Sequence, residues 1–282
     1  MVTKQKKLNI VILGTGSAIG DYLINRFYVE KHNLLLVGQN KSKFEVLKKK
    51  LIKQKYQIIN FDRFDITNKN KFLNFIKKNK NFIKKADLII NTIGEQGEIN
   101  NFFNLNIGKF RKTLNINFFS YVFLIKSLYK LIKNSKNSLI IVFSGGGVTD
   151  RRDNFSPYCI SKVALVKLVE ILSYEFKNKN IRINAIAPGI IKSRMTQNLL
   201  KSKKKLSKEE IKKINKELIN SQYSLNNIYL LINFLLSKNA RNISGKLISS
   251  RWDKFKNWNK SKINKIIFSD IFTIRRKISF NE

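Results

Sequence analysis

The sequence predicts an α/β fold in which helices cover both faces of a parallel sheet of about seven strands. The run at residues 8–13 is apolar without polar alternation, the pattern of a strand buried on both faces. Further short runs rich in apolar residues alternate along the chain with longer helical segments. That alternation is typical of βαβ units joined by right-handed crossovers. The 282 residues include only two prolines and no linker rich in Ser, Pro or Gly. Residues 1–250 are therefore predicted to form a single domain, with a basic extension over residues 251–282.

The expected strands are the apolar runs, and the expected helices lie between them. The strands are predicted at residues 8–13, 34–37, 56–61, 86–91, 138–143, 181–186 and 246–249. The helices are predicted at about residues 20–31, 42–53, 68–80, 109–133, 155–177 and 225–236. One more helix is expected to start at Ser207, where Glu210 completes a capping box. The lysine-rich stretch between Gly189 and that cap is expected to be irregular.

The segment from Ile116 to Ile132 is apolar nearly all round. Such a helix needs burial on more than one side. The sheet covers one side, and a second copy of the chain is the expected cover for the other. This predicts a homodimer or homotetramer.

The formal net charge of +38 is a common footprint of proteins that bind nucleic acid or anionic membranes. Here the basic residues are mostly lysines scattered through nearly every polar stretch, with abundant Asn and Ile beside them. These three residue types share A/T-rich codons, so base composition explains all three, whereas a binding footprint explains only the lysines. The sequence also lacks an evident cluster of arginines and aromatics for reading bases. Nucleic acid is therefore not an expected partner.

Cys159 is the only cysteine, so no disulfide can form within the chain and a reducing cytoplasm is the expected location. The apolar run at residues 8–13 is too short for a signal peptide, and no apolar segment reaches bilayer length, so no membrane partner is expected. The single histidine, His32, has no His, Cys or carboxylate at ligand spacing. It is expected at the surface, and no metal site is predicted.

The turn after the first predicted strand reads Gly14-Thr15-Gly16-Ser17-Ala18-Ile19-Gly20, and a helix follows it. Glycines here allow a tight turn, a close approach of the main chain to a pyrophosphate, and close packing of helix on strand. The helix N-terminus favours the negative charge. A purely structural turn is the alternative. The position after a first buried strand favours dinucleotide binding in a Rossmann-like, doubly wound fold, with these residues at the cofactor: Gly14, Gly16, Ser17, Ile19 and Gly20.

An acidic residue at the end of the second strand would bind the ribose diol of NAD, and none is present there. Gln39 and Asn40 are expected to hydrogen-bond a 2′-phosphate instead, with Lys41 or Lys43 adding charge. The predicted cofactor is therefore NADP(H), with NAD(H) as the other possibility. Asp65-Ile66, after the third strand, is expected to touch the adenine, and an aspartate that only caps a turn is the alternative.

Tyr158 and Lys162 stand four apart on an apolar predicted helix, so their side chains share one helix face. A free tyrosine has a pKa of about 10. A lysine cation and the positive charge of an oxidised nicotinamide would both favour the phenolate, which gives a group that exchanges protons near neutral pH. For this pair taken alone, simple packing with a snorkelling lysine is the alternative.

Six motifs, in order, make the chain resemble the short-chain dehydrogenase/reductase family, of the shorter type with about one domain. They are the glycine-rich turn at residues 14–20, Asn91-Thr92-Ile93-Gly94 after the fourth strand, Asn117 on the long helix, Ser144 after the fifth strand, Tyr158-Cys159-Ile160-Ser161-Lys162, and Pro188-Gly189 after the sixth strand. The resemblance covers about residues 8–250.

The resemblance implies roles for these residues. Tyr158 would be the general acid/base, Ser144 would hydrogen-bond the substrate oxygen, and Lys162 would also bind the nicotinamide ribose. Asn117 would position a water that links Lys162 to solvent. The remaining residues expected at the cofactor are Asn91, Gly94, Pro188, Gly189, Ile191 and Ser193.

Three positions depart from the family pattern. Leu13 and Ala18 replace a threonine and a glycine of the turn motif. Ser144 precedes Tyr158 by 14 positions, about one more than the family interval, and Gly145 occupies the usual place of the serine. The glycines that follow are expected to let Ser144 reach the site.

The chain is therefore predicted to be an oxidoreductase that transfers a hydride between NADP(H) and a small carbonyl or alcohol substrate. The loops at residues 95–103, 146–157 and 190–205 would form the substrate pocket. Three arginines lie in or near these loops, namely Arg151, Arg152 and Arg194. They either bind an anionic group of the substrate or are simply solvated. The alternatives are a sugar-nucleotide epimerase or dehydratase with the same nucleotide fold, and a non-catalytic dinucleotide-binding regulator or scaffold.

Overall fold

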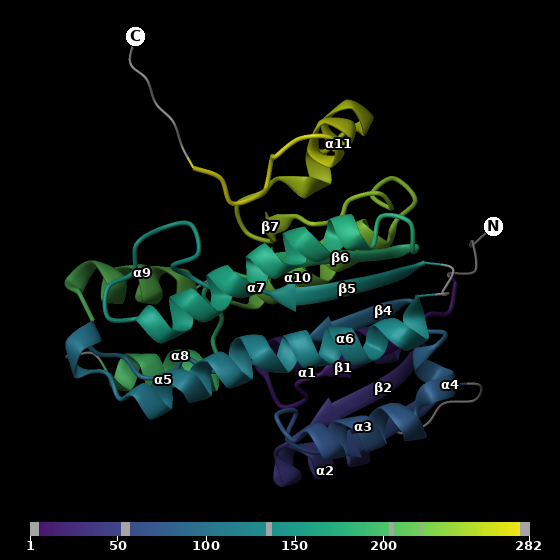
Figure 1. Cartoon of the computed structure of the whole chain (residues 1–282), viewed down its shortest axis with the longest axis horizontal. Helices are drawn as coiled ribbons and strands as arrows, with labels where there is room; N and C mark the ends of the chain where they lie inside the picture. The colour runs from purple at the N-terminus through teal and green to yellow at the C-terminus, as the bar shows by residue number, and fades with distance from the viewer. Residues whose placement is uncertain (1–5, 52–56, 134–136, 203–205, 220, 277–282) are drawn as a thin grey trace.

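The computed structural model describes residues 6–51, 57–133, 137–202, 206–219 and 221–276. Its centre is a seven-stranded parallel sheet in the order β3-β2-β1-β4-β5-β6-β7, with helices on both faces (Figure 1). The predicted fold class is confirmed. The strands are β1 (Asn9–Leu13), β2 (Asn33–Gly38), β3 (Ile59–Arg63), β4 (Leu88–Asn91), β5 (Ser138–Phe143), β6 (Ile181–Ala187) and β7 (Leu247–Ser249).

Helices line the two faces of this sheet, and alternate residues of the central strands enter separate cores. The helices are α1 (Ala18–Val29), α2 (Lys41–Lys50), α3 (Lys69–Lys78), α4 (Lys80–Ile83), α5 (Ile107–Leu114), α6 (Ser120–Ile132), α7 (Ser156–Glu175), α8 (Arg194–Lys201), α9 (Lys208–Leu218), α10 (Ser221–Leu236) and α11 (Lys260–Ile267). In β1, Ile10 and Ile12 pack with α1 and α10, whereas Val11 and Leu13 pack with α3, α6 and α7. Burial on both faces explains why β1, β2, β4 and β5 read as nearly uninterrupted apolar runs.

The third strand lies further along the chain than predicted. β3 begins at Ile59, and residue 56 of the predicted strand lies outside the described residues, as does the predicted end of the second helix at residue 53. β3 stands at the edge of the sheet and is only partly buried, so polar Asn60 and Asp62 are tolerated within it. The predicted strand overlaps β3 at residues 59–61 and ends before Asp62 and Arg63, which the strand includes.

The helix predicted at residues 109–133 is present but not uniform. A π-helical segment, η2 (Asn115–Phe119), joins α5 to α6. Such a segment widens one turn and often marks a functional site. Its centre is Asn117, which is fully buried. Hydrophobic periodicity alone does not indicate this local change of pitch.

The stretch after β6 was predicted to be irregular, and this is wrong for residues 194–201, which form α8. Ser193 is the N-cap, and the Thr196 N–H donates to its Oγ at 3.2 Å. Leu199 packs in a small third core with Ile99, Phe155 and Ile214. These tertiary contacts support a helix that the surrounding lysines obscure, and residues 203–205 lie outside the described residues.

His32 is buried, at 3% exposed, so its predicted surface position is wrong. Lys31 adopts a left-handed conformation with a φ of 62° at the end of α1, and this turn carries His32 inward. There the Leu8 N–H donates to Nδ1 at 3.3 Å, and Nε2 lies 3.4 Å from Oε2 of Glu30. The ring is part of the packing beneath β1 and β2.

Residues beyond β7 pack on α10 and on the outer edge of the sheet. The chain forms a short 3-10 turn, η4 (Phe255–Asn257), and then α11. Four of its side chains join the core that contains α10, namely Phe255, Trp258, Ile263 and Ile266. The Leu247 N–H of β7 donates to the Phe272 carbonyl at 2.8 Å. The division into a domain at residues 1–250 and an extension stays a prediction. Within the described ranges, no helix is long and apolar enough to cross a bilayer.

Candidate active site

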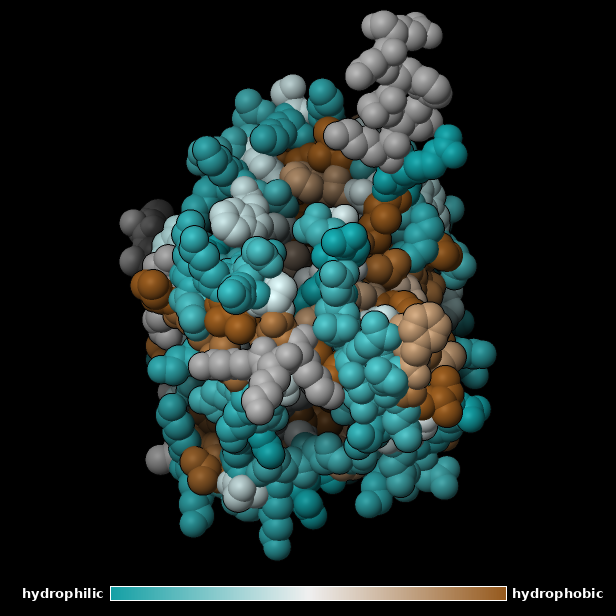
Figure 2. Space-filling model, turned by 90° about the vertical axis from the view of Figure 1, so that its left-hand side faces the viewer, coloured by the Kyte–Doolittle hydropathy of each residue, from teal (hydrophilic) through white to brown (hydrophobic). Residues whose placement is uncertain are grey.

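The carboxyl ends of the strands meet at the end of the molecule where α5, α8 and α9 lie (Figure 1). In open parallel sheets this is the edge at which ligands bind. Figure 2 views the molecule from that end, where hydrophilic side chains surround smaller hydrophobic areas. The residues predicted at the cofactor or in catalysis lie at the end of β4 or on loops and helices that follow strands of this sheet.

The glycine-rich turn forms a cradle that larger residues would fill. The N–H groups of Gly14 and Thr15 both donate to the Val37 carbonyl, which ties the turn to β2. Gly14 has a φ of +104°, and a Cβ there would stand 2.3 Å from Oγ1 of Thr92. Ser17 is the N-cap of α1 and accepts from the Gly20 N–H at 3.0 Å. The turn therefore presents a helix N-terminus, as dinucleotide binding requires.

Asp21 occupies part of this cradle, and sequence reasoning missed it. Its Oδ1 accepts from the Gly16 N–H at 2.7 Å. Burial raises the pKa of Asp21, while the bond from Gly16 and the charge of Lys43 act in the opposite direction. A carboxylate here stands where a pyrophosphate would bring negative charge. The available signal was an acidic residue directly after the last glycine of the motif.

The residues predicted around the adenosine ribose lie together at the ends of β2 and β3. Nε2 of Gln39 donates to Oδ2 of Asp65 at 2.9 Å, and Nζ of Lys43 donates to the Gly16 carbonyl at 2.7 Å. Asn40 caps α2, since its Oδ1 accepts from the Lys43 N–H. Ile66 is buried in the core beside α3, so only its main chain remains available to a ligand. Gln39 and Lys43 thus lie at this edge with their side-chain nitrogens bonded to neighbouring groups.

Two predicted cofactor residues, Asn91 and Gly94, lie at the end of β4 and on the loop after it. Asn91 at the end of β4 accepts the Ile93 N–H at 3.0 Å, and its Nδ2 is buried without a hydrogen-bond partner among the described residues. A Cβ on Gly94 would lie 3.4 Å from Oδ1 of Asn117 and 3.5 Å from Nζ of Lys162. Gly94 therefore packs closely against two of the predicted catalytic residues.

Asn117 joins the loop after β4 to helix α7. Its Oδ1 accepts from the Glu95 N–H at 2.8 Å, and its Nδ2 donates to the Glu95 carbonyl at 2.9 Å and to Oγ of Ser161 at 3.1 Å. Oγ of Ser161 in turn donates to the Tyr158 carbonyl at 2.7 Å. The π-helical segment thus gives Asn117 a bridging position, and no free N–H of this amide is left to bind a water.

Tyr158 and Lys162 are both buried on one face of α7. Nζ of Lys162 donates to the Phe143 carbonyl at 3.0 Å and lies 5.9 Å from the ring centroid of Tyr158. Burial lowers the pKa of Lys162 from 10.5 to about 8. Burial also raises the pKa of Tyr158 from 10.0 to about 12, and the guanidinium of Arg152 opposes this rise. Without cofactor the phenol is therefore protonated at neutral pH, as a proton donor must be.

Ser144 and Gly145 follow β5 and differ in their relation to the phenol. Ser144 is buried, and its Oγ has no hydrogen-bond partner among the residues that the structure describes. A Cβ on Gly145 would stand 2.1 Å from the Tyr158 hydroxyl oxygen. Gly145 therefore lies directly beside the phenol, and the catalytic role of Ser144 stays a prediction.

The loop after β6 is held by an ion pair that sequence reasoning also missed. The Ile190 N–H, next to Pro188-Gly189, donates to Oε2 of Glu217 at 3.0 Å, and Nη1 of Arg251 lies 3.1 Å from the same oxygen. Both side chains are largely buried, at 7% and 15% exposed. Ile191 is buried, and Ser193 uses its hydroxyl to cap α8. The only sequence signal was a glutamate on the apolar face of the helix that contains Ile214.

Two pockets flank the segment that contains α8 and α9, and both are lined by the loops predicted for substrate binding. One has a volume of about 510 Å³ and is lined by Arg151, Arg152, Asp153, Asn154, Phe155, Leu206, Ser207, Glu209 and Glu210. The other has a volume of about 580 Å³ and is lined by Glu95, Gln96, Gly97, Glu98, Ile99, Lys109, Lys112, Thr113, Asn198, Leu199 and Ser202. Arg194 is exposed and lines neither of these two pockets.

Across the part of the chain that the structure describes, no group of three or more His, Cys, Asp and Glu side chains is placed to hold a metal ion. The polar groups at this edge include amides, hydroxyls, main-chain N–H groups and ammonium or guanidinium cations, together with single carboxylates such as Asp21 and Asp65. Such groups suit a phosphate-bearing organic cofactor and a polarised substrate oxygen.

Comparison with known proteins identifies the family and the fold. A family model for short chain dehydrogenase matches residues 8–204. The 3-oxoacyl-(acyl-carrier-protein) reductase of Buchnera aphidicola subsp. Baizongia pistaciae is 30% identical over 243 residues, which are 83% of this chain and 90% of that protein. Levodione reductase superposes with a TM-score of 0.74 at 22% identity, covering 90% of this chain and 100% of that chain. ElxO with NADP bound superposes with a TM-score of 0.70 at 22% identity, covering 86% and 97% of the two chains.

Proposed function

This chain belongs to the short chain dehydrogenase family, and from that premise we propose that it is an NADP(H)-preferring carbonyl reductase or alcohol dehydrogenase with Tyr158 as its general acid/base. Members of this family are NAD(P)-dependent oxidoreductases. The observation that carries the proposal is the buried pair of Tyr158 and Lys162, which lie on one face of α7 at the ligand-binding edge of the sheet.

The residues present fit a dinucleotide. The glycine turn is a cradle that a Cβ would fill, and buried polar atoms of Thr15 and Asn91 have no hydrogen-bond partner among the described residues. When bound, the reduced nicotinamide supplies the hydride. Tyr158 donates its hydroxyl proton to the carbonyl oxygen, and Lys162 holds a positive charge beside the phenolate that forms. Ser144 is the proposed hydrogen-bond donor to the same oxygen.

NADP(H) is the preferred cofactor in this proposal, and NAD(H) is the other possibility. Gln39 and Lys43 supply an amide and a cation at the end of β2, and no acidic residue follows that strand directly. The Asp65 carboxylate lies nearby but is engaged by Gln39 and by Thr67. The similar fold of ElxO with NADP bound supports the same choice.

The proposed substrate is a small carbonyl compound or alcohol. The names of the reductase relatives make a 3-oxoacyl thioester the first one to test. The protein would be titrated with NADPH and NADH by nicotinamide fluorescence and then assayed with acetoacetyl-coenzyme A and a panel of ketones. Tyr158→Phe should keep NADPH binding and lose turnover by about 100-fold or more. A Tyr158→Phe enzyme with parental turnover would refute the acid/base assignment.

A non-catalytic dinucleotide-binding regulator is the second candidate. The observation that favours it is Gly145, which lies beside the Tyr158 hydroxyl while Ser144 Oγ is unpartnered among the described residues. This candidate predicts tight NADPH binding without turnover of any compound in the panel.

A second copy of the chain is the proposed partner. Phe119 at the end of η2 is 55% exposed, and Ile160, Ile171 and Tyr174 of α7 are 48%, 47% and 69% exposed. These apolar side chains are a candidate interface for a homodimer or homotetramer, which light scattering would detect. The cytoplasm is the proposed location, on the argument that a single cysteine forms no internal disulfide.

A further inference from the structure

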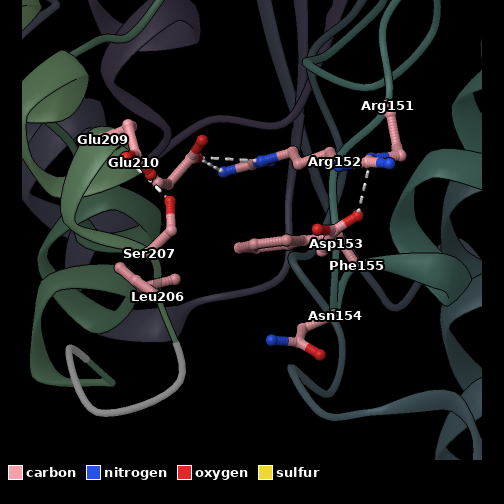
Figure 3. A pocket seen from close by; sticks show the side chains of 9 residues that line it. All are labelled: Arg151, Arg152, Asp153, Asn154, Phe155, Leu206, Ser207, Glu209 and Glu210. Atoms are coloured by element: carbon pink, nitrogen blue, oxygen red, sulfur yellow. Dashed lines mark hydrogen bonds and ion pairs between the residues drawn. The ribbon is translucent and has the colours of Figure 1, made fainter.

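Arg152 bridges two elements that face the active site. Its guanidinium reaches across a pocket to Glu210 of α9 (Figure 3), with Nη2 at 2.6 Å and Nε at 2.9 Å from Oε1. The two side chains are 13% and 19% exposed. Two N–H groups of the arginine donate to one carboxylate oxygen in a charge-assisted contact, and both side chains are largely buried, so Arg152 is not a solvated surface cation.

The same guanidinium is stacked against the start of the catalytic helix. Its Cζ lies 3.7 Å from the ring centroid of Phe155, directly before α7, and 6.0 Å from the ring centroid of Tyr158. A Cβ on Gly146 would lie 3.7 Å from Nη1, so the glycine run after β5 passes close by. Packing on one side and the ion pair on the other therefore keep this cation near the phenol.

Other titratable groups from two helices also face Tyr158. Lys162 of α7 lies 5.9 Å from its ring centroid, Tyr121 of α6 interacts with it, and Cys159 is its neighbour on α7. Burial is the main reason why the pKa values of Tyr158 and Cys159 are raised. Arg152 opposes the rise at both groups, whereas Glu210 adds to it at Cys159. Arg152 and Glu210 thus act on this part of α7 with opposite signs.

We propose that Arg152 is a positioning residue that acts through Tyr158, as a second cation besides Lys162 that favours the phenolate, and that Glu210 holds this cation in place and partly cancels its charge. The inference rests on the proposed function of Tyr158 as the acid/base. A guanidinium without its carboxylate would attract a phenolate more strongly at the same distance. Glu210 therefore tunes the proton affinity of Tyr158 from the far side of the pocket.

The first test uses Cys159, the only cysteine of the chain and a half-buried neighbour of Tyr158. The pH dependence of its alkylation by iodoacetamide reports the thiolate fraction and needs neither cofactor nor substrate. Arg152→Met should move the alkylation curve to higher pH, because it removes the cation. Glu210→Gln should move it to lower pH, because it leaves the cation uncompensated.

Arg151→Met is the matched control for this titration. Arg151 is one position away from Arg152, is 90% exposed and pairs with Asp153. Its removal changes the net charge of the protein by the same amount but changes the electrostatic field at Cys159 far less. Its alkylation curve should coincide with that of the parent. Shifts of one sign in both the Arg152 and Glu210 variants, or no shift in either, would overturn the proposal.

The second test follows alcohol oxidation against pH, with NADP⁺ and 3-hydroxybutyryl-coenzyme A. Arg152→Met should shift the rising limb of kcat to higher pH and lower kcat on that limb by about three- to tenfold. Glu210→Gln should shift the limb to lower pH, and Arg152→Lys should restore part of the loss. A merely structural bridge predicts lower kcat in both variants with an unchanged pH profile, which would contradict the proposal.

These tests remain decisive if one variant or one assay fails. If Arg152→Met does not fold, Glu210→Gln must still move the alkylation curve to lower pH, and Arg152→Lys, which keeps the positive charge, must stay close to the parent. If the parent oxidises or reduces no compound of the panel, the proposed function fails. The alkylation curves then decide on their own whether Arg152 and Glu210 act with opposite signs beside Tyr158.

Discussion

Gly145 and Tyr158 are so close that a methyl group on Gly145 would stand 2.1 Å from the phenolic oxygen and 2.6 Å from Cζ. The main chain after β5 therefore contacts the phenol and limits its position. No side chain fits at this position unless Tyr158 or the loop moves. The glycine thus determines where the proposed acid/base can lie.

Gly145→Ala should displace the Tyr158 hydroxyl and lower kcat by about tenfold or more, because a shift of an ångström misplaces an acid/base. The measurement is the steady-state kcat with the best ketone of the panel. Gly146→Ala is the control, since its Cβ would meet Arg152 atoms only at 3.7 Å or beyond, which is ordinary contact. The control should lose less activity than Gly145→Ala, and equal losses would contradict the steric explanation.

Ser144→Ala should separate stability from activity. The Ser144 Oγ is buried without a hydrogen-bond partner among the described residues, so its removal should stabilise the fold by up to about 1 kcal/mol. If Ser144 donates to the substrate oxygen as proposed, kcat should fall by about 100-fold. Urea unfolding and steady-state kinetics measure the two effects, and a parental kcat would exclude Ser144 as that donor.

Lys162→Met should make the protein more stable at pH 7. Burial lowers the pKa of Lys162 from 10.5 to about 8, so between these values the unfolded chain holds the proton more often than the folded one. The contribution of Lys162 to the free energy of unfolding therefore rises with pH between about 8 and 10.5 and is lowest below pH 8. The methionine variant should gain up to about 3 kcal/mol at pH 7 and lose this advantage towards pH 10. Urea unfolding at both pH values measures the gain, and a less stable variant at pH 7 would refute the expectation.

Asp21→Asn should tighten NADPH binding. The Asp21 carboxylate accepts the Gly16 N–H within the cradle proposed for the pyrophosphate, so neutralising it removes a repulsion of about 1 kcal/mol. Fluorescence titration should show about a fivefold lower Kd. Asp87→Asn makes the same charge change next to the amino end of β4, at the opposite edge of the sheet, and should leave Kd unchanged. Weaker binding by Asp21→Asn would place the pyrophosphate elsewhere.

Glu217→Gln should loosen the loop after β6. The Glu217 carboxylate accepts the Ile190 N–H and pairs with Arg251, and removing its charge leaves a largely buried guanidinium uncompensated. The free energy of unfolding should fall by about 1–3 kcal/mol, and Kd for NADPH should rise by about threefold or more. Glu175→Gln on the exposed end of α7 is the control and should change neither quantity. Unaltered cofactor affinity in Glu217→Gln would show that this loop does not contact the cofactor.

Sequence patterns predicted the elements whose signals are local. The runs that became β1 and β5 are apolar because both faces of each strand are covered, and the turn at residues 14–20 has glycines because its backbone requires them. β3 was misplaced because an edge strand carries polar residues. α8 was missed because its support comes from a small core that includes distant Ile99 and Phe155.

Sequence motifs also identified most residues of the candidate site but not the contacts between them. The spacing of Tyr158 and Lys162 indicated a shared helix face, and α7 confirms it. The burial that moves their pKa values in opposite directions depends on helices and loops packed around them. The buried position of His32 likewise follows from a left-handed turn at Lys31 that no motif marked.

By itself the sequence determined the fold class and the order in which the candidate site residues reach one edge of the sheet, because repeating apolar runs and glycine turns are properties of neighbouring residues. Only the tertiary structure decided which side chains meet there. Arg152 and Glu210 are 58 positions apart, and Ile190 and Glu217 are 27 apart. Contacts over such separations depend on how whole elements pack. The phenol of Tyr158 therefore meets the main chain at Gly145 and its neighbouring charges only when the chain is folded.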